Sequence, residues 1–121
     1  MPLPERAFDR GELYMGFMDP VFGREIGGYK YRPCLVVSIP DINSKGLVTI
    51  VPGTSTQQTE ESWNCVRIKN TRSNGLYNVT YFLCHQVRAV EQARLAHRIG
   101  AVSQQDLSRI REVLGRCLAI L

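Results

Sequence analysis

The sequence predicts a mainly β domain of the α+β class that ends in one C-terminal α-helix. Short runs rich in β-branched residues, one of them with apolar side chains at every second position, occupy much of the chain between residues 11 and 84. An apolar period typical of an amphipathic helix appears only after residue 103. With 121 residues the chain has the length of a single domain, residues 1–121.

Five strands are expected before the helix. Every second residue from Leu13 to Phe17 is strongly apolar, which is the period of a strand with one buried face. Prolines and glycines crowd the next segment, so a long loop is expected there. The full set of expectations is a strand at 11–17, a loop at 18–33, a strand at 34–39, a turn at 40–46, a strand at 47–51, a polar loop at 53–62, a strand with Asn64, Val66 and Ile68, a turn at 72–75 and a strand at 79–84.

The C-terminal helix has a clear start signal. Ser103 is followed three residues later by Asp106, a pattern close to a capping box, whose side chains bind the first unpaired amides of a helix. The apolar residues that follow recur at helical spacing: Leu107, Ile110, Leu114, Cys117, Leu118 and Leu121. This face must pack on the strands or on a second subunit, and the spacing leaves both possibilities open.

Composition excludes several classes of protein. No apolar run approaches the roughly 18 residues that span a bilayer, and the first residues lack the apolar stretch of a secretory signal. A cytoplasmic protein with no membrane partner is therefore expected. The four cysteines form no Cys-x-x-Cys pair and have no histidine at zinc-ligand spacing. They are expected to be ordinary buried thiols in a reducing compartment.

The positive charge is concentrated in the second half of the chain. Residues 1–62 carry six basic and eight acidic side chains, whereas residues 63–121 carry nine and three, so the net charges are −2 and +6. Twelve of the fifteen cations are arginines, whose planar fork suits phosphate or carboxylate. Such a surface attracts polyanions or an acidic partner protein, unless it is only a solvated basic face.

Most catalytic signatures are absent. The chain has no phosphate-binding P-loop, no dinucleotide fingerprint, no His-Glu-x-x-His and no Gly-x-Ser-x-Gly. Cys84 precedes His85, yet neighbours on a strand point to opposite faces. This pair is therefore not expected to act as nucleophile and base.

Two loops at strand ends hold the polar groups of interest. One leads through Lys30, Tyr31 and Arg32 into the second expected strand, and the other leaves the third strand through Thr54 and Ser55. Because these strands are expected neighbours, the loops can meet at one end of the sheet. Arginine with hydroxyl groups suits a phosphate, and tyrosine rings stack on unpaired bases. A phosphate or nucleic-acid site and ordinary strand-end chemistry both remain open.

An ordered series of short motifs runs along the chain. Its members are Gly-Glu-Leu-Tyr at 11–14, Asp-Pro at 19–20, Gly-Arg-Glu at 23–25, Arg-Pro-Cys-Leu-Val-Val-Ser at 32–38, Val-Pro-Gly-Thr at 51–54, His-Gln-Val-Arg-Ala-Val at 85–90, Arg-Leu at 94–95, Ile-Gly at 99–100 and the capped helix. This ordered set resembles the MazF/PemK (Kid) family of toxin endoribonucleases. The match is collinear from about residue 10 to residue 121, and it is the ordered set that is specific.

This resemblance implies a small SH3-like β-barrel of the MazF/CcdB toxin type with a C-terminal helix, assembled as a homodimer. It also implies cleavage of single-stranded RNA, often mRNA, without a metal ion or other cofactor, leaving a 2′,3′-cyclic phosphate and a 5′-hydroxyl. The implied partner is an acidic antitoxin protein that covers the RNA-binding groove.

The resemblance also assigns roles to individual residues. Arg32 would stabilise the charge of the transition state, Thr54 would hold the scissile phosphate, and Glu25 would orient Arg32 or accept a proton. Gln86 would contact a base. The RNA-binding positions expected in this chain are Lys30, Tyr31, Ser55, Gln86 and Arg88.

Two departures from the family pattern and two other functions are also considered. His85 stands where the family usually has an acidic residue, and Gly53 replaces an apolar or small residue before Thr54. CcdB-like toxins share the barrel but bind and poison DNA gyrase. Arg32 and Thr54 favour the nuclease over this alternative. A homologue that has lost activity and only binds its antitoxin is the other possibility.

Overall fold

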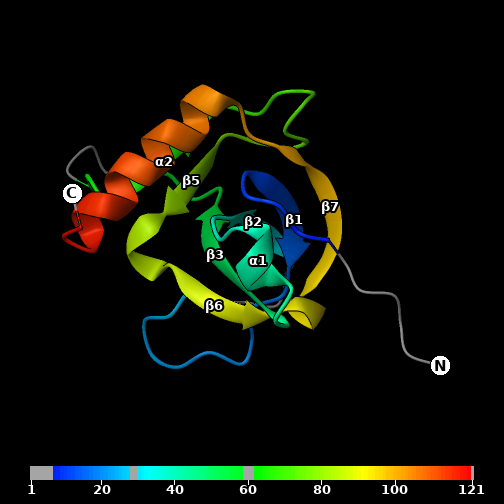
Figure 1. The fold of residues 1–121 in the computed structure, drawn as a ribbon. Coiled ribbons are helices and arrows are strands. Elements are labelled where there is room, and N and C mark those ends of the chain that lie inside the picture. The colour runs from blue at the N-terminus through cyan, green and yellow to red at the C-terminus, as the bar shows by residue number, and fades with distance from the viewer. Residues whose placement is uncertain (1–6, 28–29, 59–61, 121) are drawn as a thin grey trace.

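The computed structural model describes residues 7–27, 30–58 and 62–120. Figure 1 shows a curled sheet with a long helix on one side of it. The elements in chain order are β1 (Glu12–Gly16), β2 (Arg32–Val36), α1 (Pro40–Asn43), β3 (Leu47–Thr54), β4 (Cys65–Ile68), β5 (Thr80–Leu83), η1 (Cys84–Gln86), β6 (Arg88–Glu91), η2 (Gln92–Arg94), β7 (Leu95–Ala101) and α2 (Gln104–Cys117).

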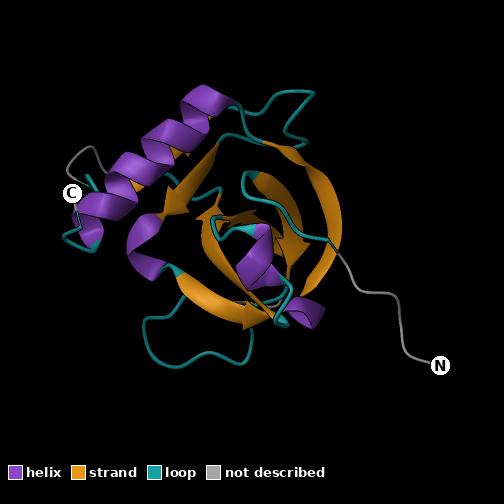
Figure 2. Ribbon diagram, viewed as in Figure 1, coloured by secondary structure: helices purple, strands orange, loops and turns teal. Residues whose placement is uncertain are grey.

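The strands form one antiparallel sheet that curls around a core (Figure 2). Its order is β4-β5-β3-β2-β1-β7, and β6 joins by pairing with the first half of β3. The far end of β3 pairs instead with β5, at Gly53 and Thr54. Within the described ranges no ladder joins β4 to β7. The expected mainly β fold with a C-terminal helix is confirmed, although hydrogen bonds do not close the sheet into a barrel.

Strand alternation divides the core into two parts. Cys34 and Val36 of β2 belong to one buried cluster, whereas Leu35 between them belongs to a second cluster, which also includes Ile110 of α2. The apolar face of α2 therefore packs on the strands of its own chain through Ile110, Leu114 and Cys117, whereas Leu118 of the predicted stripe lies just past the helix and is 54% exposed. Ser103 Oγ accepts a hydrogen bond from the Asp106 amide at 3.1 Å, which confirms the predicted cap. The last residue of the predicted apolar stripe, at position 121, lies outside the described residues.

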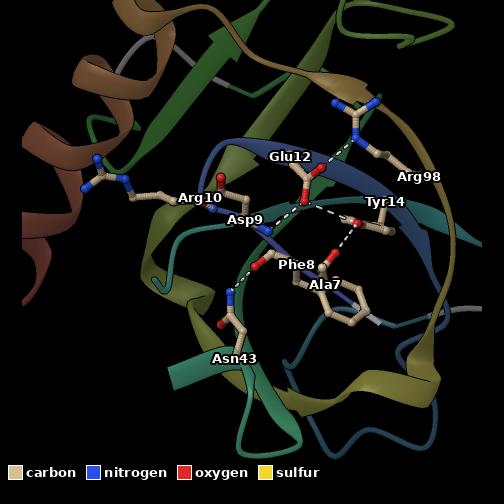
Figure 3. Close-up of polar contacts among 8 residues, drawn as sticks. All are labelled: Ala7, Phe8, Asp9, Arg10, Glu12, Tyr14, Asn43 and Arg98. Atoms are coloured by element: carbon tan, nitrogen blue, oxygen red, sulfur yellow. Dashed lines mark hydrogen bonds and ion pairs between the residues drawn. The ribbon is translucent and has the colours of Figure 1, made fainter. Parts of the chain in front are cut away.

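The described N-terminal residues are fastened to the sheet by polar contacts (Figure 3). Glu12 Oε1 accepts from the Asp9 amide at 2.6 Å, and Glu12 Oε2 pairs with Arg98 Nε of β7 at 2.7 Å. The buried side chain of Asn43 donates to the Phe8 carbonyl at 2.9 Å. These contacts lie at the Leu47 end of β3, away from Thr54.

Two strands were not predicted, because their sequences lack a period of two. β6 has a single buried residue, Val90. β7 lies at the edge of the sheet, and register shifts against β1 interrupt its alternation, so its burial follows no regular pattern. Edge strands bury only part of one face, which weakens their apolar signal.

Several predicted boundaries were also wrong. The long loop ends at residue 31, because Arg32 and Pro33 already pair with β1. The second strand stops at Val36 rather than at residue 39, and the turn at 40–46 contains the short helix α1. β3 continues to Thr54, so the polar loop begins later than expected. No helix in the described ranges has the length and apolar character needed to cross a bilayer.

Candidate active site

The two loops singled out in the sequence meet, as predicted, at one end of the sheet. β2 and β3 pair with Cys34 opposite Pro52, and the same register brings the first residue of β2 beside the last residue of β3. A groove of about 320 Å³ opens there. Five of the eight predicted site residues line it: Lys30, Tyr31, Arg32, Thr54 and Ser55.

Backbone carbonyls fix the guanidinium of Arg32. Its Nη1 donates to the Gly53 carbonyl at 3.1 Å, and its Nη2 donates to the Gly27 carbonyl. Each bond uses one of the two hydrogens that Nη1 or Nη2 carries. The other hydrogen of each nitrogen can bind a phosphate oxygen, while the carbonyls hold the planar guanidinium in place. Burial lowers the pKa of this guanidinium, while the nearby Cys34 and Asp19 act in the opposite direction. The group still carries its positive charge, because the guanidinium of arginine is not deprotonated in proteins.

Thr54 is held with its hydroxyl available as a donor. Its Oγ1 accepts a hydrogen bond from the Thr56 amide at 3.2 Å, so its O–H can point to another acceptor. The glycine before it is required by packing. A Cβ at Gly53 would lie 2.6 Å from Thr80 Cγ2 and 3.1 Å from Phe82 Cε1, both in buried residues. The departure from the family pattern at this position therefore has a local structural cause.

The loop between β1 and β2 is tied down by two long side chains. Gln86 Oε1 accepts from the Ile26 amide at 2.6 Å, and Gln86 Nε2 reaches the Arg24 carbonyl at 3.5 Å. Arg94 donates to the carbonyls of Phe17 and Asp19, at 3.3 and 2.5 Å. Both side chains therefore hold the loop whose Gly27 carbonyl binds Arg32.

The other three predicted site residues do not line the groove. Glu25 is exposed, and its Oε1 accepts from the Phe22 amide at 2.7 Å. The side-chain amide of Gln86 forms its hydrogen bonds with the loop, as described above. Arg88 lies on β6, and its charge lowers the pKa of the buried Cys34 thiol slightly against a larger upward shift. Arg32 is thus oriented by two backbone carbonyls, whereas the Glu25 carboxylate binds a different group.

The prediction of buried thiols is confirmed for two of the four cysteines. Cys34 and Cys84 are buried, and burial raises the pKa of each thiol to about 12. All four are free, although Cys65 and Cys117 are only half-buried. Exposed His85 contacts Asn64, with His85 Nδ1 2.5 Å from Asn64 Nδ2. In the part of the chain that is described, no three histidines, cysteines or carboxylates gather as a metal site would require.

A tyrosine that the sequence analysis missed lies on the same groove. Tyr77 lines it together with Leu76 and Asn78, and 90% of its surface is exposed. The signal in the sequence is a large aromatic residue two positions after the turn at 72–75, where polar side chains are usual.

A larger hollow of about 560 Å³ lies at the opposite end of β3, but its polar groups bind one another. Asn43 Nδ2 donates to the Phe8 carbonyl, and Gln92 Nε2 donates to the Asn43 carbonyl at 2.6 Å. The cations of the basic half are likewise partly engaged, since Arg98 pairs with Glu12 and Arg109 with Asp106. The groove beside Arg32 is therefore the candidate active site.

Comparison with known sequences identifies relatives across nearly the whole chain. The family model described as "PemK-like, MazF-like toxin of type II toxin-antitoxin system" matches residues 9–118. "Probable endoribonuclease MazF" of Mycolicibacterium smegmatis is 31% identical over 80 residues, which are 66% of this chain and 72% of that protein. "Endoribonuclease EndoA" of Bacillus subtilis is 26% identical over 113 residues, or 93% of this chain and 95% of that protein.

Solved structures share the fold. The crystal structure of MazF from Deinococcus radiodurans superposes with a TM-score of 0.79 at 26% identity, covering 95% of this chain and 99% of that one. An endoribonuclease from a mycobacterial species, solved in complex with its cognate antitoxin, superposes with a TM-score of 0.74 at 22% identity, covering 95% and 98%. The second likeness is one of fold.

Proposed function

Because this chain belongs to the family of PemK-like, MazF-like toxins of type II toxin–antitoxin systems, we propose that it is an endoribonuclease that cuts single-stranded RNA without a metal ion. The observation that carries the proposal is the meeting of Arg32 and Thr54 in one groove, with the guanidinium fixed by two carbonyls. The reaction then removes messenger RNA from translation and arrests growth in the cytoplasm.

The proposed chemistry uses the nucleophile that RNA itself carries. The 2′-hydroxyl attacks the adjacent phosphorus, the bond to the 5′-oxygen breaks, and the products are a 2′,3′-cyclic phosphate and a 5′-hydroxyl. The protein must position the phosphate, neutralise the charge that builds on its oxygens, and move one proton.

Each part of that task falls to a residue of the site. Arg32 donates two hydrogen bonds to the phosphate oxygens, where charge develops, and Thr54 donates a third. Glu25, the one carboxylate among the eight candidates, would leave the Phe22 amide and turn to the groove to accept the proton of the 2′-hydroxyl, and the leaving 5′-oxygen takes a proton from solvent. Lys30 and Tyr31 line the groove, with Ser55, for the neighbouring nucleotides. We assign Arg88 to the RNA more distant from the cut, and we assign Gln86 to holding the loop whose Gly27 carbonyl binds Arg32.

A homodimer and an acidic antitoxin complete the proposal. One groove of about 320 Å³ covers little of an RNA strand, so two symmetry-related grooves would hold a longer segment. The +6 charge of residues 63–121 suits an acidic polypeptide as well as RNA, and the two would compete for the same surface. The fold likeness to an endoribonuclease solved with its antitoxin supports this pairing.

The decisive experiment maps cuts on a long natural RNA in the presence of EDTA and identifies the chemistry of the new ends. Arg32→Ala and Thr54→Val should each lower kcat/KM about 100- to 1000-fold, the usual cost of losing one donor to a transition-state oxyanion. Arg111→Ala is a matched control, because Arg111 is an exposed arginine of α2 that does not line the groove.

Cleavage that stops with the chelator, or full activity in both site variants, would contradict the proposed chemistry. DNA breaks that depend on gyrase, with RNA left intact, would favour the CcdB-like alternative. A folded protein that binds an antitoxin but cuts nothing would be the inactive homologue.

A further inference from the structure

Tyr77 is the most exposed large apolar side chain in the described part of the molecule. It shows 90% of its surface to solvent and lies on the rim of the candidate groove. Exposing an aromatic ring this fully sacrifices the free energy that its burial would contribute. Single exposed apolar residues are common on surfaces, so exposure alone assigns Tyr77 no role. The loop that carries Tyr77 and the groove residues beside it do indicate a role.

The backbone that carries Tyr77 is rigidly built. Buried Asn74 accepts hydrogen bonds from the Thr71 amide at 2.9 Å and the Leu76 amide at 3.0 Å, and it donates to the Lys69 carbonyl at 2.9 Å. Gly75 has φ +70°, a conformation that favours glycine.

Packing against β7 adds to this support. A Cβ at Gly75 would lie 3.2 Å from Ile99 Cβ and still nearer to the Ile99 carbonyl. The next side chain, Leu76, is 6% exposed. The ring of Tyr77 is therefore presented from a fixed loop, so little backbone entropy would be lost when it binds a ligand.

The lining of the groove combines two chemically different kinds of group. The loop leading into β2 and the end of β3 supply cations and hydroxyls, through Lys30, Arg32 and Thr54. Tyr77, Leu76 and the half-buried Met15 and Ile99 add apolar groups to the lining, alongside the polar Asn78 and Thr80. A single-stranded nucleotide is divided in the same way, because its phosphate is anionic and its base offers an apolar face.

We propose that Tyr77 is a stacking platform for an unpaired nucleobase next to the scissile phosphate held by Arg32 and Thr54. This inference rests on the proposed RNA cleavage and adds a binding residue to it. Stacking uses the π-face that every base has, so Tyr77 contributes affinity and position without selecting one base strongly.

The expected effect follows from the strength of base–aromatic stacking. Tyr77→Ala should weaken binding of single-stranded RNA and lower kcat/KM about 5- to 150-fold, which corresponds to the 1–3 kcal/mol per stacked base. Tyr77→Phe keeps the ring and should stay within about twofold of the wild type. Tyr77→Leu keeps apolar surface but has no flat ring, so most of the loss should persist.

The test combines binding and cleavage. Binding is measured by fluorescence anisotropy with a 2′-deoxy oligonucleotide, which lacks the nucleophile and cannot be cut. Cleavage uses the RNA site mapped as above, with an abasic nucleotide placed in turn on either side of the cut. Loss of the stacked base should weaken the wild type but leave Tyr77→Ala almost unchanged. Leu47→Ala, at the far end of β3, is the control for loss of an exposed apolar side chain.

The outcomes separate this inference from the nuclease itself. Equal binding and kcat/KM in wild type and Tyr77→Ala, or equal sensitivity of both to every abasic site, overturns the stacking platform while RNA cleavage stands. Absence of cleavage by the wild type refutes the nuclease, and absence of binding as well overturns both. A Tyr77→Ala defect in antitoxin binding alone would make Tyr77 part of a protein interface and overturn the assignment to RNA.

Discussion

Substitution of Gly53 by alanine tests whether packing behind the groove controls the position of Arg32. The added Cβ would lie 2.6 Å from Thr80 Cγ2, closer than real Cβ atoms approach their neighbours, and 3.1 Å from Phe82 Cε1, which is a tight contact. Thr80 is 3% exposed and Phe82 is fully buried, so neither can swing into solvent. The strand must therefore move at the residue whose carbonyl accepts the bond from Arg32 Nη1.

The magnitude follows from two opposing effects. Overpacking of a buried site costs about 1–3 kcal/mol. Replacing glycine by alanine returns about 0.4–1 kcal/mol by restricting the unfolded chain. We therefore expect Gly53→Ala to lose about 1–2 kcal/mol of unfolding free energy, which lowers the ratio of folded to unfolded protein roughly 5- to 30-fold. The measurement is urea unfolding followed by circular dichroism, at one protein concentration for all variants.

A second substitution removes the atom responsible. Thr80→Ser deletes Cγ2 but keeps the hydroxyl that donates to the Asn78 carbonyl at 3.0 Å. In the Gly53→Ala background it should recover part of the stability and of kcat/KM, with the contact to Phe82 limiting the recovery. Unchanged stability in Gly53→Ala, or additive effects of the two substitutions, would refute this reasoning.

Two further predictions concern the loop and the thiols. Gln86→Leu removes the hydrogen bond to the Ile26 amide and should lower kcat/KM about fivefold, which corresponds to roughly 1 kcal/mol for one hydrogen bond, while the same RNA sites are cut. Altered cut sites would show instead that Gln86 contacts a base. The control is Gln86→Glu, which keeps an oxygen that can accept from the Ile26 amide. The unfolding free energy should fall as pH rises from about 9 towards 12, because the unfolded chain ionises Cys34 and Cys84 while burial keeps their pKa near 12 in the folded protein. Titration with a thiol reagent at pH 8 checks the same point, since labelling of either cysteine before unfolding contradicts its burial.

The placement of charge bears on how RNA and an antitoxin would share the surface. The groove cations Lys30 and Arg32 come from the half of the chain with net charge −2, whereas the surplus of arginines lies in the other half. Arg98 and Arg109 are paired within the molecule, so the +6 overstates what a polyanion meets. Surface ion pairs of this kind are weak and can exchange their partners for phosphates or carboxylates.

Local sequence patterns were sufficient to predict a helix or strand wherever its own residues show a cap or an apolar run. Ser103 and Asp106 predicted the start of α2, and the apolar spacing after them predicted the face that packs on the sheet. β2 and β3 were recognised from β-branched runs, since both are central strands with buried faces. The adjacency of Arg32 and Thr54 followed from the pairing of these two strands. The roles of these two residues in RNA cleavage came from the resemblance to the family motifs.

Only the tertiary structure could decide features that depend on neighbours distant in the sequence. β7 was missed because an edge strand with register shifts buries no regular set of side chains. Tyr77 joins the groove only because Asn74 and Gly75 fold its loop against Ile99. Gln86 was assigned to a base, yet in the fold it holds the backbone of the β1–β2 loop. Sequence periodicity reports which face of an element is buried, whereas the partner of a polar side chain is set by loops that meet only in space.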